Sequence, residues 1–292
     1  MTKTPPKNLT NDDQKVSKTY VNDAWQDGSP PVLAPNSQAM WLSTIVFDGA
    51  RALSGHLPDL DLHSERVNNS AIELGMIPTK TTEEIIQLSK DGVAMFPPDA
   101  ELYICPMYYA EDGFITPDPD STKFVLSIYE APLPEPAGFR ACKISFRRPM
   151  ADMAPTNAKA SCLYPNVARG VSEARQKGFD CGVVLDPEDN VAEFSYTNLF
   201  FAKDGIVHTP VTNGTFLNGV TRQRVIQLLR DNDIEVQDRT ITYEELADAD
   251  ELFSTGNYSK LLPCIGLDGR DLQPGPLFQK ARELYFDFVE RS

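Results

Sequence analysis

The sequence lacks the short motifs that mark several large enzyme classes. It contains no Gly-x-Gly-x-x-Gly, no Walker phosphate loop, no Gly-x-Ser-x-Gly and no His-Glu-x-x-His. Dinucleotide-binding oxidoreductases, P-loop NTPases, serine hydrolases of the nucleophile-elbow type and zinc peptidases therefore have no support. Only three histidines occur, His56, His63 and His208, and their spacing suits no metal site. We predict a protein without a bound metal.

Cysteine is scarce and irregularly placed. The five residues are odd in number and form no Cys-x-x-Cys; they are Cys105, Cys142, Cys162, Cys181 and Cys264. A disulfide framework or a structural zinc site is therefore not expected. This usage is typical of a reducing compartment, and we predict the cytoplasm.

Positive charge and long apolar runs are also lacking. There are 27 basic against 42 acidic residues, a formal net charge of −15. That charge would repel nucleic acid and anionic membrane surfaces, so neither is expected as a partner. No apolar run approaches the roughly 20 residues that span a bilayer, and the first residues include no apolar signal segment. The length and the hydrophobic content of 41% fit a soluble chain of one or two domains.

Residue patterning predicts a mixture of helices and strands along the chain. The first half is expected to hold a strand ending in 44–53, helices over 61–76 and 81–96, and strands over 102–109 and 123–129. Thr81 and Glu84 form a capping-box pattern at the start of the second helix. The second half is expected to hold helices over 167–177, after Gly219 and over 276–290, hairpins turning at 187–190 and 204–205, and a strand over 251–257.

Proline marks the expected domain boundary. Residues 131–138 contain three prolines and a closing glycine, which resist both helix and sheet. We therefore predict a flexible tail over 1–20, a small α/β domain over 21–130, a linker over 131–138 and a larger domain over 139–292.

Two residues point to a particular chemistry. Lys159 lies among small residues with Tyr164 five positions later, and Glu193 follows a predicted hairpin turn. A lysine amine can bind an aldehyde cofactor covalently, and a carboxylate beside a pyridine nitrogen keeps that nitrogen protonated. Taken alone, a solvated lysine and an exposed strand glutamate would be the ordinary interpretation.

Further segments occur in a characteristic order around these two residues. They are Val-Phe-Asp-Gly-Ala-Arg at 46–51, His-Ser-Glu-Arg at 63–66, Gly-Val-Thr-Arg at 219–222 and Ala-Asp-Glu-Leu-Phe-Ser-Thr-Gly-Asn at 249–257. Together with the Lys159 and Glu193 segments, this pattern resembles the class IV aminotransferases, the family of branched-chain and D-amino acid transaminases. The resemblance extends from about Ser37 to Val289, and several ordered motifs are more specific than any one of them.

The resemblance implies a fold, a cofactor and a set of site residues. The fold would be that of fold-type IV pyridoxal phosphate enzymes, with a small α/β domain, a larger domain built on a barrel-like sheet, and a homodimer. The reaction would be ping-pong transfer of an amino group between an amino acid donor and a 2-oxo acid, with Lys159 as the catalytic residue. The cofactor-binding residues implied are Arg66, Lys159, Tyr164, Glu193, Val220, Thr221, Thr255, Gly256 and Asn257. The substrate-binding residues implied are Trp41, Phe47, Arg51, Tyr103, Cys105 and Tyr258.

Some of these residues have ordinary alternatives. Phe47 is as readily explained by core packing, Arg66 by a surface ion pair, and Thr221 by routine helix capping. Only their order along the chain favours the functional interpretation.

The sequence departs from the branched-chain pattern at two places. Relatives tend to have Tyr-Ile-Arg-Pro where this chain has Tyr-Ile-Cys-Pro with Cys105, and Gly-Thr-Ala where this chain has Gly-Asn-Tyr at 256–258. A substrate carboxylate would then need another cation, such as Arg51 or Arg148, or backbone N–H groups. A D-amino acid or (R)-amine transaminase, a lyase of the same fold such as an aminodeoxychorismate lyase, and a cofactor-binding protein without activity remain alternatives.

Overall fold

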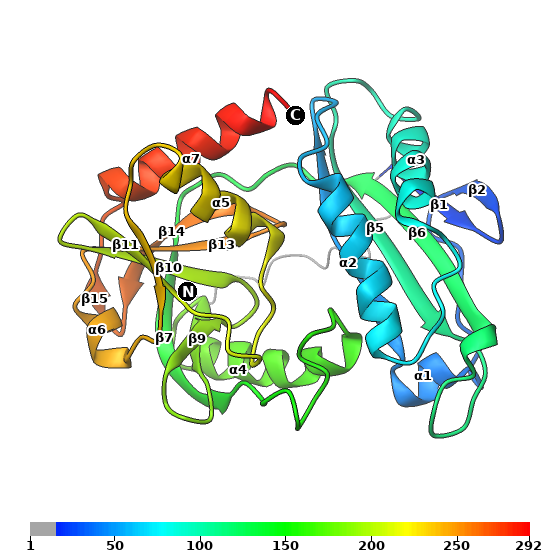
Figure 1. The fold of residues 1–292 in the computed structure, drawn as a ribbon, viewed down its shortest axis with the longest axis horizontal. Coiled ribbons are helices and arrows are strands. Elements are labelled where there is room, and N and C mark those ends of the chain that lie inside the picture. The colour runs from blue at the N-terminus through cyan, green and yellow to red at the C-terminus, as the bar shows by residue number, and fades with distance from the viewer. Residues whose placement is uncertain (1–15) are drawn as a thin grey trace.

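The computed structural model describes residues 16–292, and its strands form two sheets that lie on opposite sides of the molecule (Figure 1). The six-stranded sheet has the order β2-β1-β6-β5-β3, with β4 also paired to β5, and every pairing is antiparallel. Its strands are β1 (Ser17–Val21), β2 (Ala24–Asp27), β3 (Ile45–Phe47), β4 (Ala50–Leu53), β5 (Glu101–Ala110) and β6 (Thr122–Glu130).

The prediction of a flexible tail over 1–20 is wrong for its last residues. Residues 17–20 belong to β1, which pairs with both β2 and β6. Alternation explains the strand, because Thr19 and Val21 are buried while their neighbours are partly exposed. Residues 1–15 of the predicted tail lie outside the described part of the chain.

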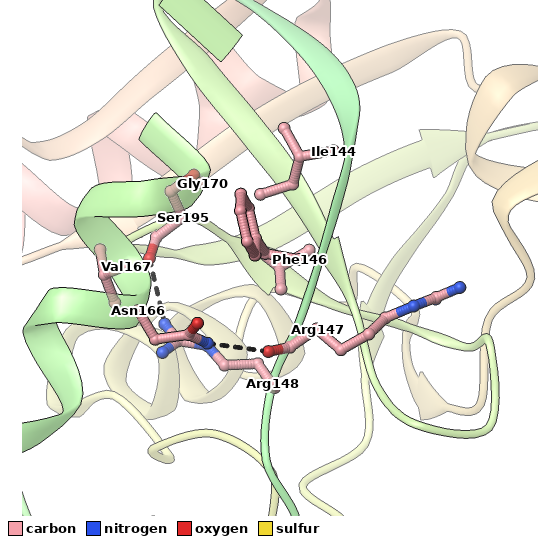
Figure 2. Close-up of a pocket in the computed structure, with 9 residues that line it drawn as sticks. Ile144, Phe146, Arg147, Arg148, Asn166, Val167, Gly170 and Ser195 are labelled. Atoms are coloured by element: carbon pink, nitrogen blue, oxygen red, sulfur yellow. Dashed lines mark hydrogen bonds between the residues drawn. The ribbon is translucent and has the colours of Figure 1, made fainter. Parts of the chain in front are cut away.

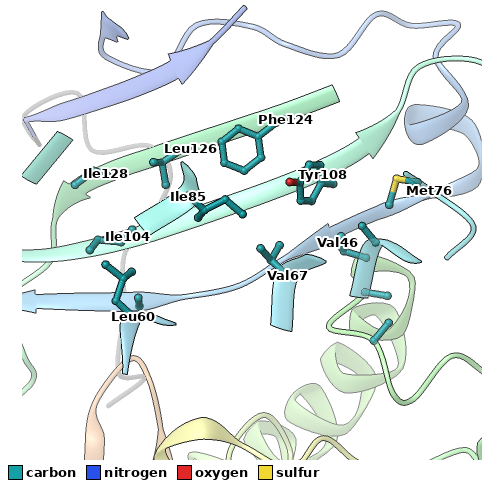
Figure 3. Close-up of a cluster of buried hydrophobic side chains, with 14 of the residues drawn as sticks. Val46, Leu60, Val67, Met76, Ile85, Ile104, Tyr108, Phe124, Leu126 and Ile128 are labelled. Atoms are coloured by element: carbon teal, nitrogen blue, oxygen red, sulfur yellow. The ribbon is translucent and has the colours of Figure 1, made fainter. Parts of the chain in front are cut away.

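Helices α2 (Leu60–Glu73) and α3 (Thr82–Val93) cover one face of this sheet. Between them and the sheet lies a buried apolar cluster that includes Val67, Ile85, Ile104 and Leu126 (Figure 3). The capping box at Thr81 is confirmed, since its hydroxyl accepts from Glu84 N and the Glu84 carboxylate accepts from Thr81 N. The sheet and its two helices thus hold Asp59 at the N-cap of α2, and His63, Arg66 and Ser70 on the helix, in fixed positions.

The strand predicted to end in 44–53 is interrupted. Residues 38–42 form the short helix α1 (Gln38–Leu42), and β3 and β4 are separated at Asp48 and Gly49. Both strands pair with β5, so the interruption is a local break in one edge. Gly49 fits the break because a Cβ there would lie 2.0 Å from the Tyr103 hydroxyl. The absence of a side chain at position 49 lets Tyr103 pack against the break, a contact that hydrophobic patterning does not reveal.

Residues 131–138 contain neither helix nor strand and lead from β6 into β7 (Phe139–Arg147). The segment separates the last strand of the first sheet from the first strand of the second. The division into two domains at this segment stays a prediction.

The second sheet has nine strands in the order β12-β11-β10-β13-β14-β7-β8-β9, with β15 paired to β14. Its further strands are β8 (Cys181–Leu185), β9 (Val191–Phe194), β10 (Asn198–Lys203), β11 (Ile206–Pro210), β12 (Val236–Arg239), β13 (Glu251–Gly256), β14 (Lys260–Leu267) and β15 (Arg270–Asp271). Strands β9 and β10 are joined by only three residues, yet four strands separate them in the sheet order. The sheet is therefore curled into a half-barrel, which fits the predicted barrel-like architecture.

Helices surround the curled sheet (Figure 1). They are α4 (Tyr164–Gln176), α5 (Val220–Arg230), the short α6 (Tyr243–Ala247) and α7 (Pro276–Val289), with 3₁₀ turns at 119–121 and 161–163. Helix α4 packs on β7 and β8, while α5 and α7 pack on each other and on β13. Among residues 16–292, no helix combines the length and apolarity that crossing a membrane requires.

Candidate active site

Lys159 lies where the two halves of the chain meet. Its backbone N–H donates to Ser70 Oγ on α2 over 3.1 Å, and its carbonyl accepts from Phe47 N on β3 over 3.1 Å. An isolated bridge between Val46 and Ala160 extends this contact. The backbone around Lys159 is therefore anchored to the first sheet and to α2, although its sequence belongs to the second half.

The Lys159 amine faces two aromatic side chains. Lys159 Nζ donates to the Tyr164 hydroxyl over 2.9 Å, and it lies 4.7 Å from the centroid of the Phe47 ring. The Phe47 and Tyr164 rings are 5.2 Å apart at an angle of 47°. Tyr164 is the first residue of α4 and remains 37% exposed. The lysine, the phenol and the ring that the sequence singled out are thus brought together.

Glu193 is buried on β9, where a carboxylate needs compensation. Burial raises its pKa, while the Arg148 ion pair and the charge of Lys159 oppose that shift. Its other oxygen accepts from Asn198 Nδ2 over 3.3 Å. Asn198 Nδ2 also donates to the Leu217 carbonyl, just before α5.

Arg148 is itself held in place from behind. Figure 2 shows its guanidinium against the Ser195 carbonyl, a hydrogen bond of 3.1 Å. The crevice drawn there, with about 10 Å³ of free space, has room for about one water molecule and none for a cofactor. Because Arg148 is committed to Glu193 and Ser195, it is poorly placed to serve as the alternative anchor for a substrate carboxylate.

Arg66 belongs to a buried polar cluster on α2. Asp48, which is fully buried, accepts from Arg66 Nε over 2.6 Å, from Arg66 Nη2 over 2.8 Å and bonds His63 Nδ1 over 2.7 Å. Burial by itself would raise the pKa of Asp48, but the charges of Arg66 and His63 hold it well below the ordinary value. Two of the guanidinium nitrogens are thus oriented by Asp48. The ion pair considered for Arg66 is therefore formed with a fully buried carboxylate, while the Arg66 side chain itself stays 19% exposed.

Arg51 is fully buried and bonds to backbone carbonyls. Its guanidinium donates to the carbonyls of Ala131 and Tyr258, and Nε lies 3.4 Å from the Asn257 carbonyl. The rings of Tyr103 and Tyr258 flank it at 5.5 and 5.4 Å. Arg51 therefore fastens the turn between β13 and β14 to β4 and to the start of the 131–138 segment. It has few donors left for a substrate.

The start of α5 and the end of β13 present unsatisfied donors and acceptors. Helix α5 begins at Val220 with Gly219 as its N-cap, and its first backbone N–H groups have no partner within the helix. Thr221 is 3% exposed, and Thr255 Oγ1 is buried with no hydrogen-bond partner among residues 16–292. Helix N-termini favour anions, and a buried hydroxyl without a partner is costly. A phosphate group fits this arrangement.

The remaining substrate candidates separate into two groups. Tyr103 lies on β5 stacked on Tyr129 at 5.4 Å, and Cys105 is two residues farther along the same strand. Burial raises the pKa of the Cys105 thiol to about 12, with Asp48 adding to the shift and Lys159 opposing it. Tyr103 and Cys105 therefore both lie near Asp48.

Trp41, in contrast, lies on α1 with 75% of its surface exposed, and its indole N–H donates to the Pro35 carbonyl. Its placement gives no support to a pocket role within its own chain.

Sequence reasoning missed several residues of this site. Asp48 and His63 lie inside motifs that carry the family resemblance, yet nothing in the sequence indicates that they form a hydrogen bond with each other. Ser70, Asn198 and Lys260 carry no sequence signal, because their importance depends on contacts between distant segments. Arg148 was considered for a substrate and is instead the partner of Glu193.

Known proteins resemble this chain in sequence and in fold. Residues 45–266 match the family model for class IV amino-transferases. An aminotransferase from Brucella abortus, whose structure holds the cofactor PLP, is 47% identical over 94% of this chain and 99% of its own, with a TM-score of 0.93. The branched-chain aminotransferase of Thermoproteus uzoniensis, solved with norvaline, is 32% identical with 94% and 95% coverage and a TM-score of 0.86.

Curated sequences give the same result. A probable branched-chain-amino-acid aminotransferase of Aquifex aeolicus is 31% identical over 84% of each chain. The fold and the match together place the chain in one class of enzyme, the fold-type IV aminotransferases. The protein belongs to the class IV aminotransferase family.

Proposed function

We propose that the protein is a pyridoxal phosphate-dependent transaminase that moves an amino group between a branched-chain-like amino acid and a 2-oxo acid. The observation that supports this most is the grouping of Lys159, Tyr164 and Phe47 within bonding or ring contact, beside a buried Glu193 paired with Arg148. The identity to the PLP-bound Brucella abortus aminotransferase supports the same cofactor here.

The residues present suit each part of that cofactor. The α5 start, Thr221, Thr255 and Arg66 would hold the phosphate, and the buried Glu193 would face the ring nitrogen. When bound, the cofactor supplies an electron sink for the carbon that loses a proton. Lys159 would hold the cofactor covalently and move the proton, and Tyr164 would orient the Lys159 amine.

Borohydride reduction of the purified protein tests the role of Lys159. Reduction should fix the pyridoxyl group on Lys159, and peptide mapping by mass spectrometry should find it there. The Lys159→Ala variant should carry no label, whereas a variant of the exposed Lys177 should label normally. A label on another lysine would refute the assignment.

We also propose that the protein acts as a homodimer in the cytoplasm. Large apolar side chains are exposed on α1 and on the loop between β5 and β6, namely Met40, Trp41, Leu42, Phe114 and Ile115. These two segments are neighbours, since Gln38 N donates to the Glu111 carbonyl. Contiguous exposed apolar surface is typical of a protein interface. Light scattering should report twice the chain mass of 32.4 kDa, and Trp41→Glu should shift it toward the monomer.

A further inference from the structure

Lys260 is a second lysine of the site region that the transamination chemistry does not use. It is fully buried at the first position of β14, where its backbone adopts the left-handed conformation with φ of 58°. A buried lysine in a conformation that favours glycine or asparagine is uncommon. We therefore expect specific contacts to hold the Lys260 side chain inside the protein.

The Lys260 amine has one polar partner and one aromatic neighbour. Nζ donates to Asn257 Oδ1 over 2.7 Å and lies 5.6 Å from the centroid of the Tyr285 ring on α7. Because Asn257 Oδ1 is occupied by this bond, the amide NH₂ must point the other way. It lies beside Gly49 and the Tyr103 hydroxyl, since a Cβ at Gly49 would be 3.1 Å from Asn257 Nδ2 and 2.0 Å from Tyr103 OH. Lys260 thus fixes which end of the Asn257 amide faces β4 and β5.

The charges around Lys260 do not balance when its amine is protonated. Asp48 pairs with Arg66, and Asp59 pairs with Arg224 through contacts of 2.5 and 2.9 Å. Those four charges cancel. Burial lowers the pKa of the nearby His63, which disfavours a positive charge on its ring. Arg51 and Lys260 are left, because within residues 16–292 neither forms an ion pair with a carboxylate and their polar contacts are carbonyl or amide oxygens. The Glu101 carboxylate acts on Arg51 through its charge without forming an ion pair. A protonated Lys260 beside Arg51 would supply two positive charges, which matches the double charge of a phosphate monoester.

The same surroundings disfavour charge on Lys260 when no anion is bound. Burial and the charge of Arg51 lower the pKa of Lys260 to about 7, with Asp59 and Asp48 opposing the shift. The groups that face it are Arg51 from β4, Asp48 beside β4, Asp59 and His63 from α2, and Tyr285 from α7. A dianion that binds nearby would raise the pKa of Lys260, because an opposite charge in a poorly solvated site favours the protonated amine.

We propose that Lys260 is a positioning residue behind the phosphate site, which holds the Asn257 amide in one orientation and takes up one solvent proton when a phosphate monoester dianion binds. The inference rests on the proposed function, since the expected ligand is the cofactor phosphate. No covalent bond changes: the Lys260 amine gains a proton from water or buffer and keeps its hydrogen bond to Asn257 in both states.

Calorimetry can measure this proton directly. The cofactor-free full chain is titrated at pH 8 with pyridoxamine 5′-phosphate, and separately with inorganic phosphate, in two buffers of different ionisation enthalpy. At that pH the phosphate, with a second pKa near 6, is already doubly charged and binds without releasing its own proton. The wild-type protein should take up a substantial fraction of a proton per site with both probes.

Three variants separate charge from packing. Lys260→Met should abolish the uptake and weaken binding by about 5- to 150-fold, the usual range for coupled sites. Lys260→Arg, which stays charged, should restore much of the affinity at pH 8 with no uptake. Lys203→Met, at a lysine that pairs with Asp248 and Asp250 far along β10, should behave like the wild type.

Each outcome has a defined meaning. Binding of either probe to the wild type without proton uptake would overturn the inference and leave the transaminase proposal standing. The same holds if Lys260→Met keeps the wild-type uptake. If pyridoxamine phosphate does not bind to the wild type at all, the proposed function fails and this inference with it.

Discussion

Among single side chains, Glu193 illustrates how much a buried charge depends on its partners. The carboxylate is 6% exposed and is compensated by Arg148 and Asn198. A residue of the same shape without the charge would keep the cofactor in place but would no longer keep the ring nitrogen protonated.

Glu193→Gln should therefore slow the first half-reaction with an amino donor by roughly a hundredfold or more, with the cofactor still bound. Stopped-flow absorbance, following conversion of the pyridoxal to the pyridoxamine form, measures this. Glu188→Gln, on the exposed turn of the same hairpin, provides the matched control. An unchanged rate for Glu193→Gln would remove the proposed role.

We expect Cys105 to affect how a substrate carboxylate is held. The Cys105 thiol lies near Asp48 and Lys159, while the two alternative arginines are committed elsewhere: Arg51 to carbonyls and Arg148 to Glu193. A charge-assisted hydrogen bond contributes about 1.5–3 kcal/mol, so its absence costs roughly ten- to a hundredfold in kcat/KM.

Cys105→Arg should accordingly raise kcat/KM for L-leucine or L-valine relative to the wild type. Cys105→Met, which adds bulk without charge, should not. A wild-type kcat/KM for L-leucine above about 10⁴ M⁻¹s⁻¹ is an ordinary value for an enzyme. Such a value would show that the wild-type protein already has an anchor for the substrate carboxylate and would contradict this prediction.

Most elements could be predicted from the sequence because their signals are local. The Thr81 capping box, the hairpin at 204–205 and the Gly219 helix start all depend on residues within a few positions. Asp204 and Gly205 both adopt the positive φ that the short turn requires. Lys159, Tyr164 and Glu193 could be selected because they lie within an ordered set of motifs.

What the sequence could not provide are the contacts between distant segments. At the strand break, Gly49 packs against Tyr103, which is 54 positions away along the chain, and the Lys159 backbone is anchored by Ser70, 89 positions away. Arg51 looks like a substrate ligand until its three carbonyl partners, which are 80, 206 and 207 positions away, are located. Contacts of this kind between distant residues leave no periodic pattern in the sequence.

Between elements, the contact of Arg51 with the β13–β14 turn joins the two sheets. One planar guanidinium donates to the Ala131 and Tyr258 carbonyls through two separate nitrogens, whereas a lysine has a single nitrogen.

Arg51→Lys should therefore loosen the turn over 256–260 while leaving the strands intact. Hydrogen exchange measured by mass spectrometry should show faster exchange in peptides covering that turn, and cofactor affinity should fall. Arg291→Lys, at an exposed arginine on the last turn of the chain, should change neither. Wild-type exchange in the turn of Arg51→Lys would show that the two sheets are joined in another way.

For the protein as a whole, the buried lysine predicts how stability depends on pH. The pKa of Lys260 is about 7 in the folded protein against an ordinary 10.5, so between these values the unfolded chain binds more protons. Stability contributed through this group therefore rises with pH from about 7 to 10.5 and is lost as pH falls toward 7.

In the cofactor-free protein, the Tm of Lys260→Met minus that of the wild type should be greatest near pH 7 and should shrink toward pH 10. Thermal unfolding followed by circular dichroism at several pH values measures this difference. Because other groups titrate equally in both proteins, they cancel. A difference that is constant across pH would mean that Lys260 is charged throughout.

The curl of the second sheet has a consequence for synthesis of the chain. Glu193 and Asn198 are close in sequence, but the strands that separate β9 from β10 in the sheet include β13, which ends at Gly256, and β14, which ends at Leu267. A nascent chain that has emerged only through Asn198 holds both residues without the sheet that orients them. Capture of the cofactor must therefore wait until nearly the whole protein has left the ribosome, and premature termination before Lys260 should yield a product that cannot bind the cofactor at all.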